Sequence, residues 1–191
     1  MKKLLLLFVV LLLAGCAAPE IQGPKGYVAY SMLAETAYGQ AYLLVRPVGH
    51  EGGGRNVGIF MTDAFSMQTV GGNSGVVKAV AFKPGTYEIY NFFTEDGARV
   101  QTRSRHDFAL RFEVKPDQVT YLGEFRATRT RAKDLVDWLK GPTPYFLWAD
   151  HRARDIPIAA KATPEVQALP SHTVRFEVVK ATPFVRTTRV D

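Results

Sequence analysis

The stretch FALRFEVKPDQVTYLGEF, residues 108 to 125, decides the fold class of this chain. In its first half, apolar residues alternate with small or polar ones at Phe108, Leu110, Phe112 and Val114. The same alternation resumes at Val119. A period of two indicates β-strands with one buried and one wet face, and such strands are antiparallel more often than parallel. We expect the two halves to pair as a hairpin closed by Lys115-Pro116-Asp117.

Similar segments follow one another on both sides of this stretch. They are rich in β-forming residues, are bounded by Gly, Pro or polar residues, and cover 27–30, 41–45, 57–61, 76–82, 87–92, 145–148 and 173–179. Many short strands at regular spacing favour a sandwich. The sequence therefore predicts an all-β, antiparallel, Ig-like or prealbumin-like sandwich with one or two short helices near the C-terminus.

Two turns repeat a pattern in which Lys-Pro leads into a strand with an early tyrosine, Tyr87 or Tyr121. Proline sets φ for the first turn position, and the Gly or Asp that follows tolerates the rest of the turn. Each tyrosine is expected to bury its ring in the core and bond its hydroxyl to the corner backbone, as in a tyrosine corner. A ligand-binding role for these tyrosines is the less favoured interpretation.

The pattern changes after Phe125. Leu135, Trp138 and Leu139 have helical spacing, which predicts a helical insert near 130–140. Asp155 is expected to cap a short helix with proline in its first turn. Residues 181–191 form a tail with no clear partner.

The N-terminus has the three parts of a signal peptide: the charged Lys2 and Lys3, an apolar run from Leu4 to Leu13, and small residues. That run is shorter than the ~20 residues of a transmembrane helix. The tetrad Leu13-Ala14-Gly15-Cys16 resembles a lipobox, in which a diacylglycerol alkylates the cysteine thiol before cleavage. Cys16 is the chain's only cysteine, so it has no intramolecular disulfide partner. The alternative is an ordinary secretory signal.

These signals divide the 191 residues into a signal peptide (1–15), a lipidated tether (16–25), a sandwich domain (26–180) and the tail. Lipoproteins retained in the inner membrane commonly carry Asp after the cysteine, whereas this chain has Ala17. We therefore expect lipid anchoring at the periplasmic face of the outer membrane. Loss of Lys2 and Lys3 lowers the formal charge of +6 by two, which leaves a mildly basic chain.

The segments KPGTYE (83–88), FEVKP (112–116), YLGEF (121–125) and RDIP (154–157) resemble a family of bacterial lipoproteins of unknown function with a transthyretin-like, or prealbumin-like, β-sandwich. The resemblance covers about 27–169, although 128–144 departs from a simple sandwich. It implies a fold and an envelope location. It implies no catalytic or binding residues.

No cluster of residues forms a catalytic or metal-binding motif, so no enzyme activity, cofactor or metal is expected. His106-Asp107 lacks a nucleophile in a Gly-x-Ser-x-Gly setting. The four histidines have no ligand spacing, and the glycine loops lack the Gly-Lys-Ser/Thr of a phosphate cradle.

Two groups of residues are candidates for binding. Arginines that the expected hairpin would bring together form a possible face for an anionic partner: Arg103, Arg105, Arg126 and Arg129. Aromatic residues in the departing segment either line a ligand groove or cap the core: Trp138, Tyr145, Phe146 and Trp148.

The function we expect is a non-catalytic binding or scaffold module for an envelope protein or a cell-wall polymer, with the membrane as a further partner through the lipid. A small-ligand carrier that uses 138–148 is the alternative, followed by an envelope hydrolase. Nucleic acid is not expected as a partner, because the signal peptide directs the chain out of the cytoplasm.

Overall fold

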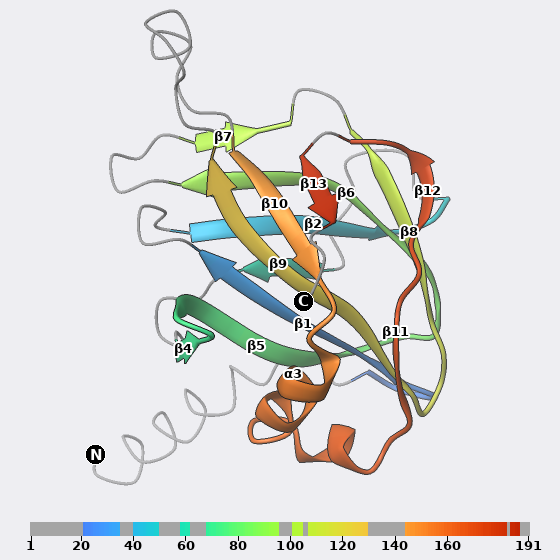
Figure 1. The fold of residues 1–191 in the computed structure, drawn as a ribbon. Coiled ribbons are helices and arrows are strands. Elements are labelled where there is room, and N and C mark those ends of the chain that lie inside the picture. Colours follow the sequence, from blue (N-terminus) through green and yellow to red (C-terminus); the bar gives the residue numbers. More distant parts are fainter. Residues whose placement is uncertain are drawn as a thin grey trace, which may run out of the picture.

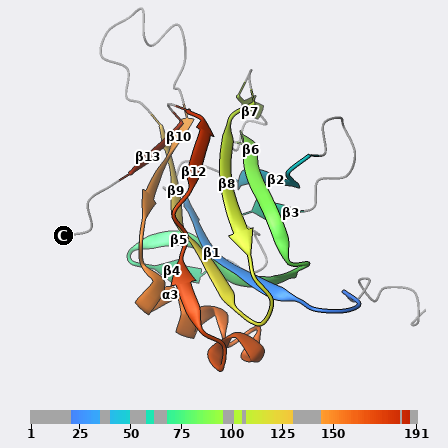
Figure 2. The same ribbon diagram turned by 90° about the vertical axis from the view of Figure 1, so that its right-hand side faces the viewer.

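The computed structural model describes residues 21–34, 40–49, 58–61, 68–95, 101–104, 107–129, 144–182 and 184–187. These residues form two β-sheets that face each other, with one α-helix on the outside (Figures 1 and 2). The expected all-β class with short helices near the C-terminus is therefore confirmed. Cys16 and the helical insert expected near 130–140 lie outside the described residues.

Sheet A has seven strands within the described ranges. Along its main path the order is β13 (Val185–Thr187), β10 (Pro144–Ala149), β9 (Val119–Arg129), β1 (Gly26–Ala34), β5 (Asn73–Phe82) and β4 (Gln68–Val70). A short strand, β11 (Ser171–Thr173), also pairs with β9. The predicted antiparallel arrangement holds for β1–β5, β4–β5 and β9–β10, but it is wrong for β1–β9, β9–β11 and β10–β13, which are parallel. The alternation of apolar residues along a strand does not fix the direction of its neighbour.

Sheet B has six strands in the part of the chain that is described. Their order is β12 (Glu177–Lys180), β8 (Ala109–Val114), β6 (Gly85–Glu95), β2 (Gln40–Pro47) and β3 (Gly58–Met61), and β7 (Gln101–Arg103) pairs with β6. All of these pairs are antiparallel.

The hairpin predicted for 108–125 is wrong, because its two strands belong to different sheets. β8 pairs with β6 and β12, while β9 pairs with β1, β10 and β11. The turn at Lys115-Pro116-Asp117 carries the chain from sheet B to sheet A. Leu110 and Phe112 of β8 and Leu122 and Phe125 of β9 enter the same core from opposite sides. A hairpin and such a corner bury the same alternate residues, so periodicity does not distinguish them.

Tyr87 forms the predicted tyrosine corner. Its ring is buried in the core, and its hydroxyl donates a hydrogen bond of 2.8 Å to the backbone carbonyl of Lys83. Tyr121 does not. Its ring packs in a second apolar cluster on the outer side of sheet A, beside Val166, and its hydroxyl bonds to Asp155.

The outer face of sheet A is covered by α3 (Arg152–Ala159) and by the 3-10 helix η2 (Pro164–Gln167) (Figure 1). Asp155 is not a cap as predicted, because the helix begins three residues earlier and Asp155 points onto the sheet. Asp150 instead accepts a hydrogen bond from the backbone N–H of Arg152, at 3.0 Å.

The C-terminal segment extends sheet A. β13 lies within the expected tail and pairs in parallel with β10, which the sequence did not predict. Within the described ranges, no helix has the length and apolar character needed to cross a membrane.

Candidate functional site

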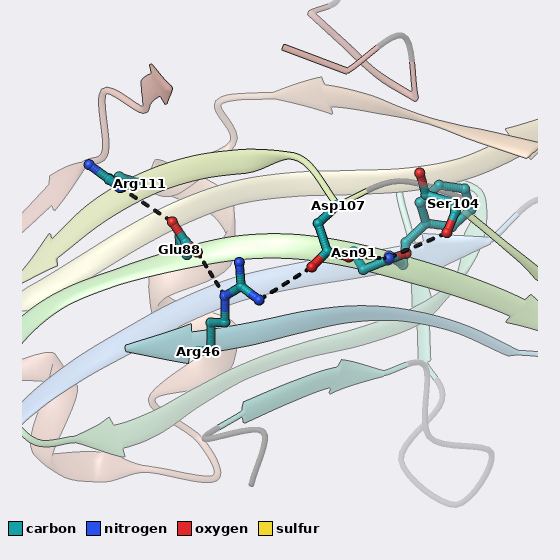
Figure 3. A network of polar contacts seen from close by, with 7 residues as sticks. Arg46, Glu88, Asn91, Ser104, Asp107 and Arg111 are labelled. Atoms are coloured by element: carbon teal, nitrogen blue, oxygen red, sulfur yellow. Dashed lines mark hydrogen bonds and ion pairs between the residues drawn. The ribbon is translucent and has the colours of Figure 1, made fainter. Parts of the chain in front are cut away.

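A chain of polar side chains crosses the outer face of sheet B (Figure 3). Arg46, Glu88 and Arg111 come from the neighbouring strands β2, β6 and β8, and the strand register places Glu88 directly opposite both arginines. Arg46 Nε donates to Glu88 Oε1 at 2.7 Å, and Arg111 Nε donates to Oε2 at 3.4 Å. One carboxylate therefore links three strands, and both of its oxygens accept from a guanidinium.

The network continues from Arg46 toward β7. Arg46 Nη1 contacts Asp107 Oδ2 at 3.3 Å, and Asp107 Oδ1 accepts from Asn91 Nδ2 at 2.8 Å. Asn91 Nδ2 also lies 3.4 Å from the backbone oxygen of Ser104. The guanidinium of Arg46 stacks over the ring of Tyr90, 4.3 Å from its centroid. These contacts hold Arg46 in one orientation.

Burial divides this network into a covered carboxylate and accessible cations. The Glu88 side chain is 8% exposed, against 25% for Arg46 and 32% for Arg111. Burial opposes the charge of Arg46, but the hydrogen bond and charge of Glu88 more than offset it, so the pKa of Arg46 is raised. Burial raises the pKa of Tyr90.

Aromatic side chains adjoin the network on the same face of sheet B. Tyr42 on β2 and Phe93 on β6 are opposite each other in register, and their rings stack with centroids 4.0 Å apart. The described helices α3 and η2 lie against sheet A (Figures 1 and 2). The sheet-B network, defined as Arg46, Glu88, Arg111, Asp107 and Asn91 with these aromatics beside it, is the candidate site.

A second polar cluster lies between α3 and sheet A. Asp155, which is 1% exposed, accepts hydrogen bonds from Ser31 Oγ at 2.6 Å and Tyr121 OH at 2.5 Å. Arg154 Nε donates to its other oxygen at 2.6 Å, and Arg154 Nη2 donates to Glu124 at 2.6 Å. This cluster attaches the helix to strands β1 and β9.

The same contacts explain the raised pKa values of Tyr121 and Arg154 in this second cluster. Burial, together with the charge and hydrogen bond of Asp155, raises the pKa of Tyr121. Burial opposes the charge of Arg154, but the bonds to Asp155 and Glu124 outweigh it and raise the pKa of that guanidinium. Because the carboxylate of Asp155 is bonded on both oxygens inside the protein, we interpret this cluster as structural.

The four arginines proposed from the sequence are not held together by any described contact. Arg103 is exposed on β7 in sheet B, whereas Arg126 is half-buried on β9 in sheet A, and its buried Nε has no hydrogen-bond partner among the described residues. β7 and the end of β9 do lie at the same end of the molecule (Figure 1). The Arg129 side chain and the whole of Arg105 lie outside the described residues.

The described aromatics of the candidate segment contact the body of the protein. Phe146 is fully buried, and its ring meets Phe92 edge to face at 5.4 Å. Trp148 is half-buried against the core, and its Nε1 donates to the carbonyl of Leu122 at 2.7 Å. Tyr145 is half-buried under the guanidinium of Arg186, 4.4 Å from the ring centroid. Trp138 lies outside the described residues.

The sequence interpretation missed the sheet-B network. Its signal was present, because Arg46, Glu88 and Arg111 each stand at a polar position between apolar residues of a strand. What the sequence lacked was the order of strands that sets the three side by side. No group of side chains that could hold a metal ion occurs in the described ranges.

Comparison with known proteins adds no relative. No protein-family model, no curated protein and no solved structure matches this chain.

Proposed function

We propose that this protein is a membrane-anchored bacterial lipoprotein whose β-sandwich is a non-catalytic binding or scaffold module for an envelope component, either a protein or a cell-wall polymer. The observation that supports this most directly is the sheet-B network, which combines accessible guanidinium groups with aromatic rings on one sheet face. Arginine and aromatic residues are enriched where proteins bind partners.

The chemistry of the network favours binding over catalysis. The Glu88 side chain is only 8% exposed and both of its oxygens accept from arginines, so this carboxylate is covered by its own partners and is not presented to a substrate. A guanidinium has five N–H donors, and the described contacts use only Nε of Arg111. The remaining donors suit carboxylate or carbonyl groups of a partner.

The carrier alternative has less support. The aromatic segment would have to open a pocket, yet Phe146 contacts Phe92 in the core and Trp148 bonds Leu122. The finer fold assignment is also our proposal: the Ig-like or prealbumin-like class is supported by the two facing sheets and by the Tyr87 corner. The expected location, the periplasmic face of the outer membrane, is proposed on the sequence Cys16-Ala17.

Capture of partners from envelope extract tests the binding surface. Arg111→Gln removes an accessible cation and the weaker of the two bonds to Glu88, so the fold should persist while capture falls severalfold. Lys161→Gln, an equal loss of charge on an exposed residue after α3, is the matched control. Thermal unfolding verifies that both variants are folded. If a folded Arg111→Gln variant captures the same components in equal amount, the sheet-B network is not the contact surface.

A further inference from the structure

Three lysines gather at the end of the sandwich where β1 begins. Lys25 precedes β1 and Lys83 follows β5, and the pair Gly26–Phe82 in the register of those strands sets the two lysines beside each other. Lys115 follows β8. A Cβ on Gly26 would collide with the Lys115 carbonyl oxygen, and Asp117 N donates to the Lys25 carbonyl at 3.0 Å. We call Lys25, Lys83 and Lys115 the lysine corner.

Two more basic side chains adjoin this corner. Arg152 Nη1 donates to the Ser171 carbonyl at 2.8 Å, and Ser171 is paired with Val119, the first residue of β9 after the turn. The neighbouring imidazole of His172 has its pKa lowered by burial and by the charges of Lys115 and Arg152. The charge around this imidazole is therefore positive overall, although Glu113 is also near.

The acidic residues at the same end only partly offset these charges. Glu113 pairs with Lys115 at 3.7 Å, and Asp117 is exposed in the turn. Among the described residues at this end, these two carboxylates stand against the three lysines and Arg152. Lys83 and Lys115 are exposed, and Lys25 is half-buried beside the ring of Tyr27, 5.5 Å from its centroid.

The lysine corner is also the end of the sandwich nearest in sequence to the proposed anchor. Cys16 precedes Gly26 by ten residues, which span at most about 35 Å when fully extended. β7 and the end of β9, which carry Arg103 and Arg126, lie at the other end (Figure 1). The nine residues of β1 separate the two ends by roughly 30 Å.

We propose that the lysine corner docks on the anionic headgroups of the membrane that holds the lipid, so that the sandwich stands on this end. The proposal rests on the lipid anchor proposed above. The tether raises the effective concentration of headgroups at the corner, so weak contacts suffice. Each lysine near an anionic surface strengthens binding roughly fivefold, and salt weakens it. The sheet-B network would remain open to a partner from the side.

Co-sedimentation with vesicles tests the corner without the lipid. The mature chain with Cys16→Ser is mixed with phosphatidylcholine vesicles that contain rising fractions of phosphatidylglycerol, from low to physiological salt. Binding should rise with phosphatidylglycerol, fall with salt, and weaken roughly tenfold or more in the variant Lys25→Gln/Lys83→Gln/Lys115→Gln. The variant Lys161→Gln/Arg175→Gln/Lys180→Gln loses the same charge at exposed residues elsewhere and should bind like wild type. Equal loss in both variants, or no binding by wild type, overturns the proposal.

A second measurement reports the orientation of the lipidated protein. A fluorescent label at Thr86→Cys, exposed beside the corner, should be quenched by headgroup-labelled lipid more strongly than a label at Thr69→Cys, exposed at the other end. This difference should be larger in anionic than in neutral vesicles, and equal quenching in both overturns the proposed orientation. Mass spectrometry of Cys16 tests the lipid anchor separately. If the lysine corner binds anionic vesicles but Cys16 carries no lipid, only the anchor is refuted. If Cys16 is lipidated but the corner does not bind, only the docking is refuted.

Discussion

Asp155 joins two strands to the helix that covers them. It accepts from Ser31 on β1, from Tyr121 on β9 and from Arg154 one residue before it in α3. A buried carboxylate is tolerated only when hydrogen bonds replace its lost hydration, and three donors do so here. Arg154, shared with Glu124, extends the attachment along β9.

Asp155→Ala should destabilise the protein by about 3–5 kcal/mol, because it leaves two buried hydroxyls and one guanidinium without their shared acceptor. Urea denaturation measures this loss. Asp150→Ala, which removes an exposed acceptor of the Arg152 N–H, should cost about 1 kcal/mol or less. Similar costs for the two substitutions would show that the buried cluster does not hold the helix.

The buried phenol of Tyr121 makes stability depend on alkaline pH. Its pKa is raised by burial and by Asp155, whereas in the unfolded chain a tyrosine titrates near pH 10. The unfolded state then loses its proton first, so stability is fully present below about pH 10 and falls as pH rises, by up to ~1.4 kcal/mol per unit.

Tyr121→Phe should flatten this alkaline fall in the free energy of unfolding, measured from pH 8 upward. Some slope should remain, because burial also raises the pKa of Tyr87. An unchanged slope in Tyr121→Phe would assign the alkaline transition to other groups.

The turn between β5 and β6 shows how a short segment sets the direction of a strand. The ring of Tyr87 packs against Phe82 at 5.1 Å and Phe112 at 5.9 Å, while its hydroxyl closes the turn on the Lys83 carbonyl. The ring thus contacts one residue of sheet A and one of sheet B, and the hydroxyl holds the turn that begins β6. Both contacts were predictable, because the turn and the tyrosine are only four residues apart.

Tyr87→Phe should keep the ring packing and lose only the hydroxyl bond, at a cost of about 0.5–1.5 kcal/mol. Tyr87→Ala should cost about 3–5 kcal/mol, since it also leaves a cavity in the core. Chemical denaturation of both variants separates the contribution of the hydroxyl hydrogen bond from that of the ring packing. Equal losses would mean that the hydroxyl bond, and not the ring, carries the stabilisation.

The molecule as proposed has one functional end and one functional face. The lysine corner faces the anchor, the arginines of β7 and β9 lie at the other end, and the sheet-B network opens to the side. A protein held at one end by lipid presents its sheet faces to partners that lie along the membrane. This arrangement depends on the modification of Cys16.

Cys16→Ser should abolish anchoring, because serine cannot accept the diacylglycerol and the lipoprotein peptidase then does not cleave. The variant should keep its leader and leave the washed outer-membrane fraction. Mass spectrometry of the wild-type N-terminus should find diacylglycerol on Cys16, with two chains holding the protein stably at ~0.8 kcal/mol per buried methylene. An unmodified residue at the mature N-terminus would contradict the proposal.

Local pattern was enough to predict most of the strands, the all-β class, the helices near the C-terminus and the Tyr87 corner. The single strand predicted over 173–179 is wrong, because the chain there passes from β11 in sheet A to β12 in sheet B. Alternation and turn residues act over a few positions, so they can be read from a single chain. The same reasoning placed Asp155 at a helix end and paired β8 with β9. Both errors concern what lies across space from a residue, which local pattern does not contain.

The tertiary structure alone decided which strands are neighbours, and with them the candidate site. Arg46 and Glu88 are 42 residues apart in sequence, and Ser31 and Asp155 are 124 apart. The lysine corner exists because β1 pairs with β5 and the Lys115 turn crosses between the sheets. Such pairings are set by the burial of a shared core and by backbone hydrogen bonding, and any strand with the right alternation can satisfy both. Only the free energy of burial and hydrogen bonding, added over all strand pairs of the chain, selects one arrangement.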